Sequence, residues 1–300
     1  MKKQLLLFAM ILLPLVASAH DIEVQNADGV TIYYNYINDG TELEVAYRGS
    51  SYDEYTNEYQ GNVAIPEEVT YMNRTRKVTS VGDGAFLHCK GLTSVTIPNS
   101  VTSIGFGAFL GCSGIKKVIV KDIAAWCGIK FGGYDSNPLF YAKHIYSDED
   151  TEITNLIIPN SVTTIGNYAF YYCKGLTSVT IPNSVTSFGY AAFDGVDIPT
   201  VISLIENPLK ITGRTWNGGT FSQNTFNNAT LYVPKGTIEK YKATGGWKDF
   251  AYIVEGTPTG IKVIENTQKK NATVYDLNGV RLSESKKGIN IINGQKVIVK

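Results

Sequence analysis

The sequence predicts a solenoid of stacked repeats, α/β to mostly β in class, with a parallel sheet, a β-rich N-terminal cap and a small C-terminal β-module. Three observations predict it: a segment that recurs every 23 residues, alternating strands before it, and Asn-Gly turns after it. The chain has 300 residues, 43% of them apolar, with 27 Lys+Arg and 27 Asp+Glu. The apolar fraction excludes wholesale disorder, and the zero net charge argues against a nucleic-acid binder, which would carry a basic excess.

Residues 1–19 have the pattern of a cleavable secretory signal peptide. A basic start, Met1-Lys2-Lys3, precedes an apolar run from Leu5 to Val16 and the small residues Ala17-Ser18-Ala19. Twelve helical residues span about 18 Å, short of a membrane core of about 30 Å. We therefore expect cleavage between Ala19 and His20 and an exported mature chain without a transmembrane segment.

Residues 20–62 are predicted to form the N-terminal cap, as an antiparallel β-meander. Residues 22–24, 30–36 and 43–47 alternate in strand fashion, with Asp-Gly turns between them. The end of a repeat stack exposes an apolar face and needs such a cap. The tyrosines of this segment are either half-buried cap residues or an aromatic platform for glycan or protein contacts. They are Tyr33, Tyr34, Tyr36, Tyr47, Tyr52, Tyr55 and Tyr59.

The repeats are predicted to span residues 63–255. The segment V-T-S-V-G-D-G-A-F-L-H-C at 78–89 recurs, with changes, at 101–112, 162–173 and 185–196. Strand-like segments such as Leu92-Thr-Ser-Val-Thr-Ile97 lie between the copies. A period of about 20–29 residues carrying L-x-x-L-x-L is the leucine-rich-repeat signature.

Each repeat is predicted to place a strand on one side and a return arm on the other. Val95 and Ile97 are two residues apart and so share the core face of a short strand, which Pro98 ends. The spacing of Val101 and Ile104 with Ala108 predicts a short helical or 3₁₀ turn on the return arm. Equivalent apolar residues then pack on one another along the stack.

The pattern I-P-x-S-V-T-x-I-G-x-x-A-F-x-x-C resembles the BspA-like leucine-rich repeats of bacterial surface proteins. The resemblance covers about residues 60–255 and implies adhesion to host matrix or to other cells at a bacterial surface. An irregular insertion interrupts the period at 121–152. A C-terminal cap is predicted at 230–254, with a final strand from Thr230 to Val233 and a short helix over 236–242.

Residues 256–260, Gly-Thr-Pro-Thr-Gly, are predicted to be a linker to a β-module at 261–300. Asn-Gly pairs at 278–279 and 293–294 predict two hairpins with type I′ turns. This tail resembles the C-terminal sorting domains of type IX secretion cargo in Bacteroidetes. The resemblance implies contact with the secretion machinery and a location on the outside of the outer membrane or in the medium. The alternative is a small β-module with no sorting role.

No catalytic, cofactor-binding or metal-ligating set is predicted. Cys89, Cys112 and Cys173 share one repeat position, whose fourth copy is Val196. Because valine can neither form a disulfide nor bind a metal, we expect these thiols to be packing groups. The histidines lack metal-ligand spacing, and no nucleophile motif of the G-x-S-x-G type occurs.

Outward positions on the predicted sheet form the candidate binding face. They are Ser94, Thr96, Lys117, Ile119, Asn155, Ile157, Ser178 and Thr180. These mostly small, uncharged residues predict a flat, hydroxyl-lined surface. We expect a non-catalytic binding or adhesion module toward host matrix proteins, other cells or glycans. The alternatives are a secreted enzyme acting on glycans and a purely structural component of a surface layer.

Overall fold

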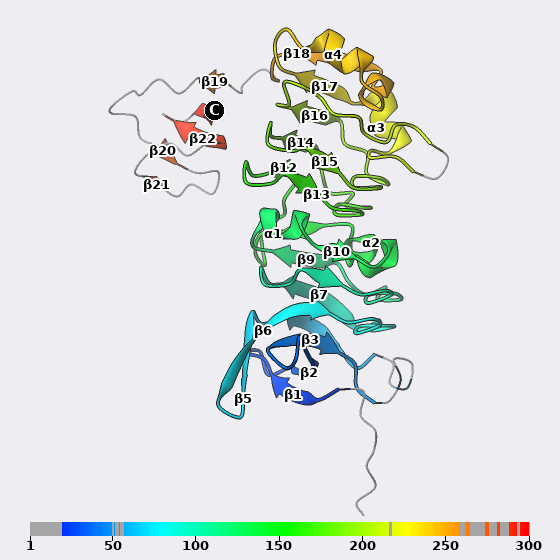
Figure 1. The fold of residues 1–300 in the computed structure, drawn as a ribbon, viewed down its shortest axis with the longest axis vertical. Helices are drawn as coiled ribbons and strands as arrows, with labels where there is room; N and C mark the ends of the chain where they lie inside the picture. Colours follow the sequence, from blue (N-terminus) through cyan, green and yellow to red (C-terminus); the bar gives the residue numbers. More distant parts are fainter. Residues whose placement is uncertain are drawn as a thin grey trace, which may run out of the picture.

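The computed structural model describes residues 20–258, except 50, 52–53, 55–56 and 216–217, and the backbone of five short strands beyond them. The predicted leader, 1–19, lies outside the described residues. The repeats stack into an elongated molecule, with the N-terminal strands at one end and two helices at the other (Figure 1). None of the described helices is long and apolar enough to cross a membrane.

Three antiparallel strands begin the described chain: β1 (Ile22–Gln25), β2 (Thr31–Ile37) and β3 (Glu42–Ala46). They join the repeats directly, because β3 pairs in parallel with β6 (Arg74–Val81). A hairpin that the sequence reasoning did not predict joins β5 (Glu68–Tyr71) to β6, and its turn residues Met72 and Asn73 both have positive φ.

Parallel strands from successive repeats form one side of the stack. The first sheet has the order β11-β9-β7-β4 and the second the order β12-β14-β16-β17-β18. In register, Val95 of β7 lies beside Val118 of β9, and Val179 of β14 beside Val201 of β16. The strands are β4 (Gly61–Ala64), β7 (Leu92–Ile97), β9 (Lys117–Val120), β11 (Ile145–Tyr146), β12 (Asn155–Ile157), β14 (Ser178–Ile181), β16 (Thr200–Ser203), β17 (Thr230–Val233) and β18 (Tyr252–Glu255).

The return arms form narrower sheets, so a short strand replaces the first part of the helical or 3₁₀ turn predicted over Val101–Ala108. A turn of the i to i+3 kind follows it, in which Ala108 N–H donates to Gly105 O at 3.3 Å. Ser103 and Ile104 form β8, which pairs in parallel with β6 and with β10 (Lys130–Phe131). In the later repeats β13 (Thr164–Ile165) pairs with β15 (Ser187–Phe188). A neighbouring repeat offers backbone partners that an isolated return arm lacks, and this pairing outweighs a weak local periodicity.

The Ala-Phe of each repeat supplies the centre of the core. Phe86 and Phe109 stack with ring centroids 4.7 Å apart, and Phe193 stacks on both Phe170 and Phe221 at 5.2 Å. All five rings are fully buried. One repeat therefore completes the packing of the next, which explains why the Ala-Phe spacing recurs.

The insertion interrupts both sides of the stack. It contains α1 (Ile123–Cys127), η1 (Tyr134–Ser136) and α2 (Leu139–Ala142). In the described chain no strand pairing connects β11 with β12 or β10 with β13. Single backbone bonds cross instead, among them Gly166 N–H to Cys127 O at 2.9 Å, Gly175 N–H to Lys143 O at 3.1 Å and Ile153 N–H to Ile145 O at 2.8 Å.

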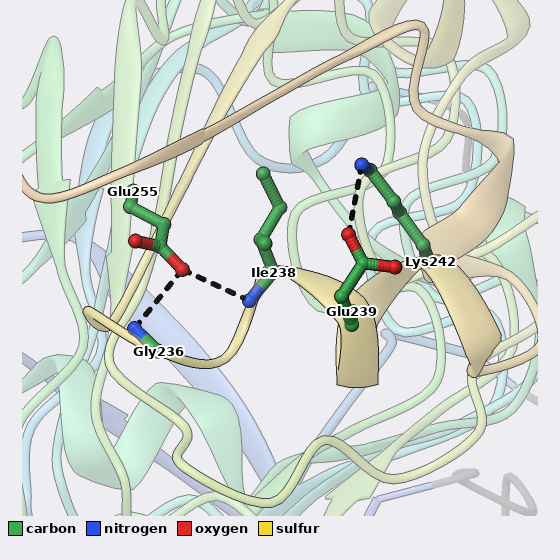
Figure 2. A network of polar contacts seen from close by, with 5 residues as sticks. All are labelled: Gly236, Ile238, Glu239, Lys242 and Glu255. Atoms are coloured by element: carbon green, nitrogen blue, oxygen red, sulfur yellow. Dashed lines mark hydrogen bonds and ion pairs between the residues drawn. The ribbon is translucent and has the colours of Figure 1, made fainter.

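The far end of the stack contains α3 (Gln223–Asn228), α4 (Ile238–Ala243) and η2 (Trp247–Asp249). The predicted final strand, β17, is not the last, because β18 pairs with it in parallel. Figure 2 shows Glu255 of β18 accepting hydrogen bonds from Gly236 N–H at 3.0 Å and Ile238 N–H at 3.5 Å, which fixes the start of α4. Glu239 and Lys242 pair within α4 at 3.1 Å.

Beyond residue 258 the described strands pair with one another, in the order β19-β23-β22-β20-β21. β20 and β21 are antiparallel, as are β22 and β23. Their bounds are β19 (Lys262–Ile264), β20 (Val274–Tyr275), β21 (Arg281–Leu282), β22 (Gly288–Ile292) and β23 (Gln295–Val299).

Candidate functional site

The predicted binding face is less open than the alternation of residues indicates. Ser94, Ile119 and Thr180 are only 3%, 2% and 4% exposed, so their place in an accessible face is a correction to the sequence analysis. Thr180 lies in register between Ile157 and Ile202. Parallel strands lie about 4.8 Å apart, and larger neighbours at that spacing cover a small side chain between them.

The other positions of the predicted face keep some exposure but bond to their own neighbours. Lys117 donates through Nζ to Glu149 O at 2.5 Å and lies over the ring of Tyr146. Ser178 Oγ donates to Asn155 Oδ1 at 2.9 Å. Thr96 and Ile157 are half-buried. The structure thus places the eight residues in two separate sheets and leaves few of their polar groups directed outward.

Cys89, Cys112 and Cys173 are buried and free, as expected for packing groups, and Cys127 of the insertion is buried and free as well. Burial raises the pKa of the Cys89 thiol to about 11 and that of Cys127 to about 12. A thiol that stays protonated is a poor nucleophile and a poor metal ligand. Among the described residues no group of His, Cys, Asp and Glu side chains could hold a metal ion.

The tyrosines of the N-terminal strands belong to the packing of that end. Tyr34 and Tyr59 are each 1% exposed, and Tyr59 Oη donates to Ala46 O at 2.9 Å. Tyr33 and Tyr36 are half-buried against the core. The described tyrosines of this segment therefore favour the cap interpretation over an aromatic platform.

A cluster of aromatic rings lies elsewhere, on the edge of the stack formed by the repeat turns. We call it the aromatic patch, and it consists of Tyr134, Phe140, Tyr168, Tyr171, Tyr172 and Tyr190. Tyr171 lies at its centre, stacked on Phe140 at 6.1 Å and edge-on to Tyr168 at 5.7 Å. Tyr134 is 49% exposed and Tyr190 40%, so the patch faces solvent.

The insertion and the regular repeats both contribute to the aromatic patch. In Figure 1, α2 lies along the same edge as the repeat turns, which brings Phe140 to the level of residues 168–172. Asn137 is fully buried between them: its Nδ2 donates to Tyr168 O at 2.8 Å and to Ala169 O at 3.2 Å. Its Oδ1 accepts from Leu139 N–H at 2.9 Å. One amide therefore fixes the insertion to the repeat that follows.

Two rings of the aromatic patch come from strained backbone positions. Tyr168 and Tyr172 have φ of 60° and 59°. Gly84 and Gly107 take the first of these repeat positions in other copies, and Gly111 takes the second. Ala191 and His88 show that other residues also enter this conformation. The left-handed region costs a residue with a Cβ about 1–2 kcal/mol, and such strain is concentrated at functional sites.

Polar groups border the rings. Asp135 is 8% exposed and Ser136 0%, and Asp135 Oδ1 and Ser136 Oγ have no hydrogen-bond partner among the described residues. A Cβ built on Gly133 would lie 3.0 Å from Asp135 Oδ1 and 3.7 Å from the ring of Phe106. A side chain at residue 133 would therefore crowd the carboxylate of Asp135, which favours glycine there.

Burial raises the pKa of two hydroxyls of the aromatic patch, those of Tyr168 and Tyr171. Burial, with the neighbouring Tyr172 and Asp194, raises the pKa of Tyr171 to about 12. Burial also raises the pKa of Tyr168, with Tyr190 and Asp135 as further causes. Lys143 lies over the rings of Phe140 and Tyr172 at 4.8 and 4.4 Å, and burial together with Lys174 lowers its pKa. The hydroxyls of Tyr168 and Tyr171 therefore stay protonated at neutral pH and can donate as well as accept hydrogen bonds.

The aromatic patch was not predicted from the sequence. A signal was present, because Tyr168 and Tyr172 occupy positions where Gly107 and Gly111 stand in an earlier copy. Aligning the copies would also have placed Tyr171 and Tyr190 on one edge of the stack. The contribution of Tyr134 and Phe140 depends on the path of the insertion, which has no second copy in the chain.

Comparisons with known proteins agree with the repeat architecture. The family profile "BspA type Leucine rich repeat region" matches six copies, over residues 64–127 and 143–241, which is more than half of the chain. The unmatched residues between them fall in the insertion. No curated protein matches the chain.

Solved structures of leucine-rich-repeat proteins are similar at low identity. A leucine rich cell surface protein from Faecalibacterium prausnitzii is 18% identical, with 71% of each chain covered and a TM-score of 0.34. A leucine-rich repeat protein from Bacteroides ovatus is 21% identical over 78% of this chain and 48% of its own, with a TM-score of 0.31. The leucine-rich repeat protein of T. pallidum is 18% identical over 70% of this chain and 86% of its own, with a TM-score of 0.36.

Proposed function

The chain belongs to the BspA type leucine-rich repeat family, and on this premise we propose that it is an exported, non-catalytic binding module displayed on a bacterial surface. Its partners are host matrix proteins, other cells or glycans. Proteins built from such repeats are typically non-catalytic binding modules. A stack of rigid repeats offers a long surface, and display of many copies converts weak contacts into avid attachment.

The observation that carries this proposal is the aromatic patch. The stacked phenylalanines already complete the core, so the rings of Tyr134 and Tyr190 are not needed to fill it. Tyrosine supplies large contact area and a polar group with little loss of conformational freedom, which suits it to recognition. The predicted face offers a second surface, through the exposed Asn155 and the half-buried Thr96, Lys117, Ile157 and Ser178.

Adhesion of the purified mature chain, residues 20–300, tests the proposal. Beads coated with many copies should be retained on at least one of three surfaces: host matrix proteins, bacterial cells or immobilised glycans. Free protein should compete only at high concentration, because single contacts are weak. No retention on any of the three surfaces contradicts the binding function. Release of soluble sugar from the glycans would favour the alternative of a secreted enzyme.

We further propose that the chain comes from a Bacteroidetes cell, that the leader is removed after Ala19, and that residues 261–300 direct the protein to the cell surface. The net charge of +5 in this tail and its two Asn-Gly hairpins support a separate module. In the native host, a chain ending at Gly256 should cross the inner membrane and then accumulate in the periplasm. Surface proteolysis after cell fractionation measures this. A truncated chain that still reaches the surface excludes the sorting role.

A further inference from the structure

We propose that the aromatic patch and two lysines beside it, Lys143 and Lys174, form a docking site for a short acidic segment of a partner protein. This inference rests on the proposed binding function and gives that function a partner class. Two observations carry it: a pair of cations without a counter-charge, and a group of exposed rings with an uneven surface next to them. The first selects the charge of the partner, and the second selects a polypeptide.

The two ammonium groups lie over one ring of the aromatic patch. The Nζ atoms of Lys143 and Lys174 are 4.4 and 5.4 Å from the ring centroid of Tyr172. The two charges therefore lie within about 10 Å of each other, which is the Debye length at 0.1 M salt, so each charge acts on the other. Lys143 Nζ donates to Phe140 O, which uses one of the three donors of that ammonium group.

Neither ammonium group forms an ion pair with a residue that the structure describes. Glu152, the acidic residue that follows the insertion loop, is bonded to His144 Nδ1 at 2.7 Å. Burial, and then the charge of Lys174, lowers the pKa of Lys143. Two like charges on a partly buried surface destabilise each other. A carboxylate from outside would stabilise both cations, and a cationic partner would be repelled.

The carboxylates near the rings are less accessible than the outer lysine. Asp135 is only 8% exposed, and Asp194 is half-buried beside Tyr171. Lys174 is exposed and Lys143 is half-buried. A partner that lies on the rings therefore meets the positive groups before the negative ones, and charge complementarity favours an acidic partner.

The exposed rings form an uneven surface and not a flat one. The pairs Tyr134–Tyr171, Tyr168–Tyr171 and Tyr168–Tyr190 have interplanar angles of 61°, 77° and 84°. Ring edges and ring faces therefore alternate along the surface. Side chains of a polypeptide fit such a surface, because they enter the spaces between ring edges one at a time. Tyrosine is also among the residues that contribute most to binding at protein interfaces.

The apolar surface continues beyond the aromatic patch on Phe106 and Leu110, which are 65% and 36% exposed. The ring of Phe106 borders the insertion, since a Cβ built on Gly133 would lie 3.7 Å from it. Gly111 N–H donates to Tyr141 Oη of α2 at 2.8 Å, which brings Leu110 close to the same helix. Large apolar side chains that gather on one exposed edge are typical of a protein interaction site.

An acidic segment that also carries aromatic or leucine side chains matches both parts of this surface. Its Asp or Glu side chains reach the two ammonium groups, and its apolar side chains pack on the rings. A small inorganic anion would leave the rings uncovered. A purely apolar segment would leave the two cations without a counter-charge and would remove water from them, which is unfavourable.

The test selects dodecapeptides from a random library displayed on phage, with the mature chain, residues 20–300, as the target in 0.1 M NaCl. We expect the selected peptides to be enriched in Asp and Glu next to Phe, Tyr, Trp or Leu. The most enriched peptide is then titrated by calorimetry beside an analogue in which Asn and Gln replace Asp and Glu. The analogue should bind about tenfold more weakly. Raising NaCl to 1 M should weaken the acidic peptide, because the Debye length falls to about 3 Å.

Variants of the parent chain locate the binding site. Lys143→Gln and Lys174→Gln should each weaken the acidic peptide about threefold to fivefold and leave the neutral analogue unchanged. Tyr190→Ala should weaken both peptides, because it removes a ring that is 40% exposed. Lys235→Gln is the control, since Lys235 is an exposed lysine in the turn after β17, and it should change neither affinity. Melting curves verify that each variant is folded.

The inference is overturned if the selected peptides show no acidic enrichment, or if both lysine variants bind the acidic peptide as tightly as the parent. It is also overturned if a sulfated hexasaccharide, titrated in parallel, binds more tightly than every selected peptide. In these cases the binding function still stands if coated beads adhere to matrix proteins, cells or glycans. If the beads do not adhere although the acidic peptide binds through the two lysines, the docking site stands and the proposed adhesion fails.

Discussion

The thiol of Cys112 donates to the carbonyl oxygen of Phe86, in the preceding repeat, across 2.9 Å. The same carbonyl also accepts from Cys89 N–H at 3.1 Å. The thiol bond is therefore an addition to a carbonyl that already has a partner. The equivalent position in the last regular copy is Val196, which is fully buried.

From this geometry, Cys112→Val should fold and lose less than about 1.5 kcal/mol, as similar-volume changes in a core usually do. Urea melts of the parent and the variant measure the difference. The mass of the native parent, without reduction, should correspond to four free thiols. A loss of several kcal/mol, or a mass lower by two hydrogens, would show that the thiol has another role.

Phe109→Ala should lower the free energy of unfolding by about 3–5 kcal/mol, because it opens a cavity between the rings of the stacked repeats. Phe109 is fully buried and stacks on Phe86 with an interplanar angle of 6°. Thr96→Ala, on the half-buried outer side of β7, should stay within about 0.5 kcal/mol. Denaturant melts compare the two. Similar losses for both would mean that the strand face is assigned wrongly.

Asn137→Ala should cost about 2–4 kcal/mol, because it removes a buried amide and leaves Leu139 N–H and Tyr168 O without this partner. Asn155→Ala is the matched control, since Asn155 is exposed and bonds mainly to neighbouring hydroxyls. Thermal melts of both variants check the difference. If Asn137→Ala melts with the parent, the insertion is not fixed to the next repeat through this amide.

The carboxyl group of Glu58 should contribute to the pH dependence of the free energy of unfolding. Burial raises its pKa to about 7, even though its carboxylate accepts from Arg48 N–H. The folded state therefore holds a proton that the unfolded chain releases at its ordinary pKa near 4.5. The stabilising contribution is complete below that lower value and is lost as the pH rises through about 7.

Glu58→Gln should remove this contribution, so the melting temperature of the variant should fall less than that of the parent between pH 5 and pH 8. Glu239→Gln is the control, because that glutamate lies exposed on α4. Melting curves at half-unit pH steps would show the difference. Parallel curves for parent and Glu58→Gln would mean that this carboxyl titrates alike in both states.

Truncation after Gly256 should leave the melting temperature of the repeats unchanged. Gly256 N–H bonds to Val233 O at 2.9 Å, and the truncated chain keeps this backbone bond. Glu255 still fixes the start of α4. The described strands beyond this point pair only with one another. A large drop in melting temperature would place residues 257–300 within the repeat fold and move the proposed boundary.

The repeats could be predicted because the same pattern of buried apolar residues recurs several times in the sequence. Phe86, Phe109, Phe170 and Phe193 recur at one position, and the structure stacks them as that recurrence requires. The return-arm strand could not be predicted from one repeat, since Ile104 gains its partners only from repeats on either side.

The sites were harder to predict for a related reason. Alternation along a strand says which way Thr180 points, but its exposure depends on Ile157 and Ile202 in neighbouring strands. The aromatic patch depends on the contact between Phe140 of the insertion and Tyr171 of the next repeat, whose rings stack. The repeat pattern could not predict this contact, because the insertion occurs only once in the sequence.

The interruption of both sheets at the insertion gives the molecule a mechanical weak point. Under tension along the long axis, neighbouring strands within each sheet share the load over many parallel backbone bonds. Between the two halves the load falls on the packed core and on single hydrogen bonds, among them Gly166 N–H to Cys127 O and the indole N–H of Trp126 to Ala169 O at 2.7 Å. We therefore expect a stretched molecule to separate first at the insertion, beside the aromatic patch, before either sheet comes apart.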